Sequence, residues 1–349
     1  MAEYKGIKGF KVQYLDQDPI PAVTAWASSN NMNSGRYFLA SGGTQTATLA
    51  AGGTTSTPAG PGITGVTEEY NGATWASNPT GLNTARFGVG GAGTQTAGLA
   101  FGGSGPPITG ATEEYDGSTW TNSNALNTAR NYITGIGTQT AGLAFSGDLP
   151  GLTTATEEYD GNSWTSSNPM ITARVYVGGA GIQTAGLAFG GETGPPAFST
   201  ATEEYDGTSW ATSPGSMNTT RNGLAGLGTQ TAALAFGGNL PPRTGATEEY
   251  DGSTWTTVNS LNTVRAFLGN AGIQTAGLAF GGDIPPSTGA TEEYDGISWT
   301  TSPVSMSTAR SALGGAGNTS AALAFGATGG ATEEWTGAGS PLTKTITVS

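Results

Sequence analysis

The sequence contains neither cysteine nor histidine among its 349 residues. Without cysteine the chain has no disulfide and no thiolate metal ligand. Without histidine it lacks the commonest general base and the commonest transition-metal ligand. We therefore expect no cofactor and no enzymatic activity, although loop carbonyls and aspartates still allow a hard-cation site.

Charge is also scarce: 11% of residues are charged, where about a quarter is usual. The net charge of −13 argues against nucleic acid as a partner, because a phosphate backbone needs a basic face. No stretch approaches the length of a membrane span, and no apolar run follows the first lysines. We expect no membrane insertion and no signal peptide.

What the sequence does contain is a repeat. The words ATEEYDGSTWT at 111–121 return almost unchanged at 155–165, 201–211, 246–256 and 290–300. The tyrosine slot recurs at spacings of 45, 44, 46, 45, 44 and 41 residues, and its last copy is Trp335. A tryptophan follows five residues later, and an arginine about ten residues after that.

The phase of the repeat indicates a closed ring. Trp26 and Arg36 match the tryptophan and arginine slots but have no TEEY before them, whereas Trp335 has no full unit after it. A strand at Trp26 or at 343–348 would complete the last unit and leave no open edge.

Each unit predicts four short strands. They are an apolar strand after the arginine, as in VYVGGAG after Arg174, then TAGLAF, ATEEY, and a last strand that holds the tryptophan. Asp-Gly between the last two indicates a two-residue hairpin turn. Four strands in about 45 residues is typical of a propeller blade. The fold class predicted is all-β, a seven-bladed β-propeller over 21–349 with an N-terminal arm at 1–20.

The order of arginine, apolar strand, Gly-Gly, tyrosine and tryptophan resembles the kelch motif. It stands here as Arg174, Gly190-Gly191, Tyr205 and Trp210, and the resemblance covers roughly 22–340. It implies a propeller and leaves function open, because similar propellers serve as enzymes, adaptors and adhesins. Kelch oxidases bind copper through tyrosine, histidine and cysteine, and this chain lacks the last two.

The near-identical units, the Gly/Thr/Ala bias, the ending TEEWTGAGSPLTKTITVS and the opening KGIKGFKVQYLDQDP are similar to repeat proteins of tailed bacteriophages. That resemblance implies a structural protein of the virion, located on the particle surface.

The paired glutamates are predicted to be structural. Neighbours in a strand point to opposite faces, so they cannot act as a catalytic pair. Seven of the eight arginines fall in the repeat slot, one for each TEE word, and guanidinium can clamp a carboxylate. We predict ion pairs between two repeated sets: the arginines Arg36, Arg86, Arg130, Arg174, Arg221, Arg265 and Arg310, and the second glutamates Glu69, Glu114, Glu158, Glu204, Glu249, Glu293 and Glu334.

Two other repeated side chains have alternative interpretations. The tryptophans are expected to pack between blades, with sugar stacking as the alternative for one or two. The glutamines of the GTQT turns are expected to cap those turns, with lining of the channel mouth as the alternative.

The loops that differ between units follow Gly-Gly or precede the arginine, and both sets are predicted to emerge on one face of the disc. That face is the expected recognition surface. The candidate residues in its loops are Pro106, Asp148, Glu192, Arg243 and Asp283.

Residues 1–20 carry three of the four lysines and alternate enough to add a strand to a partner. The candidate anchor residues are Lys5, Lys8, Phe10 and Lys11. Their expected partner is another virion protein or another copy of the chain; the alternative is a strand packed on the propeller itself.

The function predicted is a non-enzymatic bacteriophage structural protein, a head or tail appendage or fibre component, whose variable face recognises a host or surface, with a host glycan as one ligand. The first alternative is a carbohydrate-binding adhesin outside a virion. The second is a glycan-acting enzyme, which would need an asymmetric cluster of Asp, Glu, Tyr or Arg that breaks the repeat. Only Asp148, Glu192, Arg243 and Asp283 break it, and they lie in different units.

Overall fold

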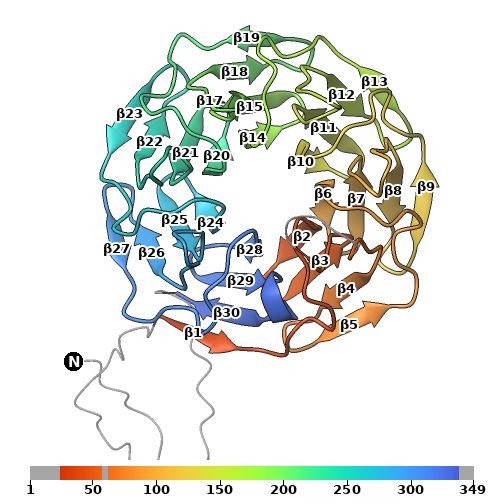
Figure 1. The fold of residues 1–349 in the computed structure, drawn as a ribbon, viewed down its shortest axis with the longest axis horizontal. Coiled ribbons are helices and arrows are strands. Elements are labelled where there is room, and N and C mark those ends of the chain that lie inside the picture. The colour runs from red at the N-terminus through yellow and green to blue at the C-terminus, as the bar shows by residue number, and fades with distance from the viewer. Residues whose placement is uncertain (1–23, 57–61, 338–349) are drawn as a thin grey trace, which may run out of the picture.

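In the computed structural model, which describes residues 24–56 and 62–337, seven four-stranded antiparallel sheets stand around a central axis (Figure 1). The innermost strands of neighbouring sheets contact one another around the whole circle, including β2 (Ala40–Thr44) with β28 (Gly314–Gly317). The chain is therefore an all-β, seven-bladed propeller, as predicted. Among the residues described, no helix is long and apolar enough to cross a membrane.

The strands fall into four concentric sets. Besides β2 and β28, the innermost set is β6 (Gly90–Thr94), β10 (Thr134–Thr138), β14 (Gly178–Ile182), β20 (Ala225–Thr229) and β24 (Gly269–Ile273). The second set is β3 (Ala47–Ala51), β7 (Ala97–Phe101), β11 (Ala141–Phe145), β15 (Ala185–Phe189), β21 (Ala232–Phe236), β25 (Ala276–Phe280) and β29 (Ala321–Phe325).

The third set carries the TEEY words: β4 (Thr67–Tyr70), β8 (Thr112–Tyr115), β12 (Thr156–Tyr159), β18 (Thr202–Tyr205), β22 (Thr247–Tyr250), β26 (Thr291–Tyr294) and β30 (Thr332–Thr336). The outermost set is β5 (Trp75–Asn78), β9 (Trp120–Ser123), β13 (Trp164–Ser166), β19 (Trp210–Thr212), β23 (Trp255–Val258), β27 (Trp299–Thr301) and β1 (Ala25–Ser28). A small hairpin, β16 (Glu192–Gly194) with β17 (Ala197–Phe198), and a 3-10 turn at Thr328–Gly330 lie in loops.

The ring is closed by a strand from the start of the chain. β1 is the outermost strand of the last blade and pairs antiparallel with β30, with Trp26 opposite Trp335. In Figure 1 the red β1 lies against the blue β30. This confirms the closure inferred from the split repeat and identifies the strand at Trp26 as the one that closes it. Residues 343–348 lie outside the described residues.

The tryptophans of the outermost strands pack between blades, as predicted. Trp164 of β13 lies with its ring centroid 4.8 Å from that of Phe101 in the preceding blade, and its Nε1 donates a 2.8 Å hydrogen bond to Oγ1 of Thr112 there. The indole N–H thus finds a partner inside the interface. All seven blades repeat this bond to the first threonine of the preceding TEE word.

Two local predictions were wrong. Tyr115 pairs with Trp120, so the loop between them has four residues rather than a two-residue Asp-Gly turn. In this loop the carboxylate of Asp116 accepts backbone bonds of 2.8 Å from Ser118 and Thr119, which stabilises the longer turn. The predicted apolar strand after Arg174 begins only at Gly178, because residues 175–177 approach the axis as a loop.

Candidate functional site

Each repeat arginine forms a buried ion pair with the first glutamate of the TEE word in its own blade. Arg174 Nη2 lies 2.7 Å from Glu203 Oε1, and both side chains are at most 1% exposed. The seven pairs are Arg36–Glu68, Arg86–Glu113, Arg130–Glu157, Arg174–Glu203, Arg221–Glu248, Arg265–Glu292 and Arg310–Glu333. The prediction that these seven arginines form ion pairs with a glutamate of the TEE word is thus confirmed.

The prediction that the second glutamate of each TEE word is the partner of the arginine was wrong, because the first glutamate takes that place. The two neighbours point to opposite sides of their strand, so the second one faces the next blade and accepts a hydrogen bond from the tyrosine there. The six bonds are Tyr70–Glu334, Tyr115–Glu69, Tyr159–Glu114, Tyr205–Glu158, Tyr250–Glu204 and Tyr294–Glu249.

Glu293 is the exception among the second glutamates. The tyrosine slot of the next blade holds Trp335, whose Nε1 donates instead to the carbonyl of Thr319 at 2.9 Å. The pKa of Glu293 is raised by burial. In the other blades the pKa of the tyrosine hydroxyl is raised instead. Burial, and then the hydrogen bond to the glutamate, raises the pKa of Tyr70 to about 12.

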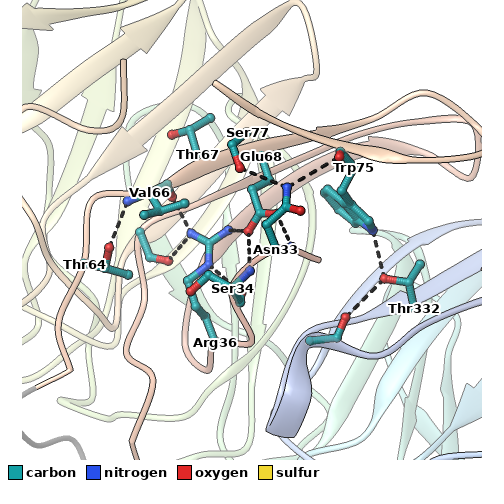
Figure 2. A network of polar contacts seen from close by, with 12 residues as sticks. Asn33, Ser34, Arg36, Thr64, Val66, Thr67, Glu68, Trp75, Ser77 and Thr332 are labelled. Carbon is teal, nitrogen blue, oxygen red and sulfur yellow. Dashed lines mark hydrogen bonds and ion pairs between the residues drawn. The ribbon is translucent and has the colours of Figure 1, made fainter. Parts of the chain in front are cut away.

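The buried pairs form a base beneath the variable loops. In Figure 2 the guanidinium of Arg36 reaches both Glu68 and the carbonyl of Val66, while the same carboxylate accepts the backbone N–H of Asn33 at 2.6 Å and of Ser34 at 3.3 Å. Asn33 and Ser34 lie in the connection that enters the blade from β1. One pair therefore fixes both loops that rise from its blade, the one before the arginine and the one after Gly-Gly.

The glutamines of the GTQT turns bridge blades, which is neither of the two functions expected from the sequence. Gln95 Nε2 donates to the carbonyl of Thr48 at 3.2 Å and to that of Tyr70 at 2.7 Å, both in the preceding blade. Six blades repeat the bridge. Asn318 in the seventh blade is shorter and caps its own turn, accepting from the backbone N–H of Ser320 at 3.0 Å.

Three of the candidate loop residues bridge the segments that follow the arginines. Residues that follow Gly-Gly form antiparallel bridges with residues that follow the arginine: Asp148 with Asn131, Glu192 with Val175, and Asp283 with Ala266. Pro106 is exposed in its loop. Arg243 forms an ion pair with Asp283 of the next blade, and each of these side chains is about a quarter exposed.

At the centre of this face lies a cavity of about 350 Å³. The second residue after each arginine approaches the axis with a positive φ, between 50° and 62°. These seven positions hold Phe38, Gly88, Tyr132, Tyr176, Gly223, Phe267 and Ala312. Four aromatic rings form a chain across the mouth, with centroid separations of 5.8 Å, 5.1 Å and 6.0 Å from Phe38 through Tyr132 and Tyr176 to Phe267.

The sequence interpretation missed this aromatic pocket because it assigned the residues after the arginine to a strand. A signal was present: the second position after the arginine is aromatic in four units, glycine in two and alanine in one. Glycine favours a positive φ and aromatic residues do not, so the aromatic members stand out once the slot is aligned. Among the described residues, no three carboxylates gather where they could hold a metal ion.

The predicted anchor, with Lys5, Lys8, Phe10 and Lys11, lies outside the described residues.

Neither a protein-family model nor a curated protein sequence matches this chain. Function therefore has to be argued from the two faces of the propeller and from its axial pocket.

Proposed function

We propose that the chain is a non-enzymatic recognition propeller, carried as a structural component of a tailed bacteriophage particle and presenting its variable-loop face to a host or surface. The observation that supports recognition is the division of the sequence between the two faces. Side chains repeated in nearly every unit form buried pairs and blade-to-blade bonds, whereas the loops fixed above them differ from unit to unit. Binding residues commonly lie on variable loops that a rigid scaffold holds in position.

The repeated carboxylates support a binding function over hydrolysis. The first glutamates are held by arginine, and six of the second glutamates accept a tyrosine hydroxyl. Of the acidic residues that break the repeat, Asp283 is paired with Arg243, Glu192 accepts a 2.7 Å bond from Asn222 Nδ2, and Asp148 accepts the backbone N–H of Gly151. A glycosidase places two carboxyls on either side of one bond; Asp148 and Glu192 are the pair that a polysaccharide-cleavage assay would have to exclude.

The particle context comes from the resemblance of the repeats to phage proteins, and it is tested separately from binding. Mass spectrometry of purified particles should detect the chain at stoichiometric copy number. Deletion of residues 2–18 should leave a folded propeller that no longer enters particles, because the arm carries the proposed anchor. Normal incorporation of this deletion would contradict the anchor and favour the uniform face that holds the GTQT turns.

The second candidate, a carbohydrate-binding adhesin outside a virion, shares the same face. A glycan array with the purified chain tests recognition, and exchange of the 239–246 loop for its counterpart at 148–155 should change the bound set. Binding to glycans without any particle association would favour the adhesin. Cleavage of a polysaccharide panel, or stoichiometric copper or zinc, would overturn the non-enzymatic proposal.

A further inference from the structure

The axial pocket combines aromatic walls with unbalanced negative charge. Tyr132 and Tyr176 contribute two neighbouring rings, and both side chains remain partly exposed toward the mouth. Burial raises the pKa of both hydroxyls, and the pKa of Tyr176 is raised further by the neighbouring Tyr132 and then by the charges of Glu192 and Asp148. Asp148 bridges Asn131 and Glu192 bridges Val175, the chain neighbours of Tyr132 and Tyr176, so both carboxylates lie beside the two aromatic residues.

Neither carboxylate has a cationic partner among the residues that the structure describes. Asp148 accepts the backbone N–H of Gly151 at 2.9 Å, and Glu192 accepts from the amide of Asn222. Nearby, Arg243 is already paired with Asp283. In a chain of net charge −13, this mouth repels anions and attracts a cation.

Two buried amide oxygens next to the pocket also lack a hydrogen-bond donor. Oδ1 of Asn131 and Oδ1 of Asn222 are unpartnered, and the two residues are 7% and 3% exposed. Asn131 directly precedes Tyr132, and Asn222 bonds Glu192 through its other amide atom. A buried acceptor without a donor is unfavourable, so a ligand that donates a hydrogen bond, through an N–H or an O–H group, would satisfy these oxygens.

The aromatic residues occupy positions where the backbone favours glycine. Gly88 and Gly223 stand in the same slot of two other blades at φ of 62° and 56°, close to the 50° of Tyr132 and the 53° of Tyr176. An aromatic residue there is strained relative to glycine. The rings also leave a cavity of about 350 Å³ beside them, so they do not simply fill the channel.

We propose that the axial pocket binds a small organic ammonium group, with the rings of Tyr132 and Tyr176 against its apolar body and Asp148 and Glu192 as its counter-charges. Aromatic faces attract a desolvated cation, and nearby carboxylates add to that attraction. The proposal rests on the proposed function in taking the variable-loop face as the recognition face. The ammonium group could be carried by a choline-type headgroup or by an amino sugar, and the experiment separates the two.

The test uses the full chain and matched pairs of small probes, with binding measured by calorimetry and by saturation-transfer NMR. Choline is compared with 3,3-dimethylbutan-1-ol, an uncharged molecule of the same shape, and glucosamine with N-acetylglucosamine. At least one charged member should bind about tenfold more tightly than its neutral counterpart. Which pair responds identifies the source of the ammonium group. Equal affinity within both pairs, or no binding of either charged probe, overturns the proposal.

Variants then locate the site. Tyr176→Gly should fold, because glycine occupies this slot in two blades, and it should weaken the bound probe about tenfold. Glu192→Gln combined with Asp148→Asn should reduce the preference for the charged probe, while Asp116→Asn on the opposite face should change nothing. Unchanged binding by both site variants overturns the assignment. If the glycan array is positive while ammonium probes fail, only this inference falls; if both fail, the proposed recognition function falls with it.

Discussion

The hydroxyl of Tyr294 donates a 2.9 Å hydrogen bond to Oε1 of Glu249, a residue of the preceding blade. The same relationship links six pairs of neighbouring blades and is missing for Glu293, whose counterpart in the next blade is Trp335 rather than tyrosine. The second glutamate of the TEE word thus has a tyrosine donor in six blades and none in the blade of Glu293, so Glu249 and Glu293 serve as controls for each other.

The first prediction compares those two glutamates. Glu249→Gln should lower the melting temperature at pH 7, because the tyrosine hydroxyl then donates to a neutral amide instead of a carboxylate. Glu293→Gln should leave it unchanged or raise it, because burial already disfavours the charge there. Thermal unfolding followed by circular dichroism measures both. Equal losses for the two variants would contradict the pairing.

The second prediction concerns alkaline pH. Burial is the first cause that raises the pKa of the interblade tyrosines, to about 12 for Tyr70, whereas an unfolded tyrosine titrates near 10. Because the folded pKa is raised, this contribution to stability is fully present below about pH 10 and is lost as pH rises toward 12. Absorbance at 295 nm should show most of the 11 tyrosines un-ionised at pH 11 in the native protein and ionised in denaturant.

The third prediction compares a buried and an exposed ion pair. Arg174→Ala leaves Glu203 charged and buried, which typically costs about 3–5 kcal/mol. Arg243→Ala breaks a pair whose side chains are each about a quarter exposed, so water can solvate the carboxylate of Asp283 that remains. Thermal unfolding should therefore shift far more for the first variant. Small and equal shifts would contradict the structural function of the repeat arginines.

The fourth prediction tests whether the turn glutamines bridge blades. Gln95→Asn keeps an amide in the turn but is too short to reach Thr48 and Tyr70, so it should destabilise the protein by about 1–3 kcal/mol, the value of two hydrogen bonds. Replacing its exposed neighbour, Thr96→Ala, serves as the control. Denaturant unfolding gives both free energies. If Gln95→Asn matches the control, the glutamine acts only within its own turn.

The fifth prediction concerns ring closure, and it compares two deletions that differ by residues 19–28, which include β1. Deleting residues 2–18 leaves β1 intact, so the free energy of unfolding should be unchanged. Deleting 2–28 removes β1 and the Trp26 ring, which lies 5.2 Å from Phe280 and 5.4 Å from Trp335. Loss of a buried tryptophan alone costs about 3–5 kcal/mol, and β30 becomes an open edge. Similar unfolding curves for the two deletions would show that β1 is dispensable.

The fold could be predicted from the sequence because the fold is built from repeated units. Aligned copies show the blade, and the unmatched slots of Trp26 and Trp335 show how the ring closes. The partner of each arginine was harder to predict, since Glu68 and Glu69 are neighbours and only the strand register decides which one faces Arg36. The bridge made by Gln95 depends on the stagger between two blades, which no pattern within one blade contains.

The axial pocket could not be assembled from the sequence for a related reason. Phe38, Tyr132, Tyr176 and Phe267 come from four blades and meet only because a ring brings equivalent positions to its axis. The repeat predicts that equivalent positions lie at the same distance from the axis. Which side chains line the pocket depends on which units have a residue other than glycine at that position. The candidate recognition residues of this propeller are therefore the exceptions to its repeat.

The pairing of β1 with β30 also imposes an order in time. Ser28 leaves the ribosome about 300 residues before its partner Glu333. At about 5–20 residues per second this interval is roughly 15–60 s. Throughout this interval β1 has no partner strand, and the blades already synthesised cannot close into a ring. β30, the last strand among the described residues, is the strand with which β1 pairs, so the last blade can close only after residue 336 has been synthesised.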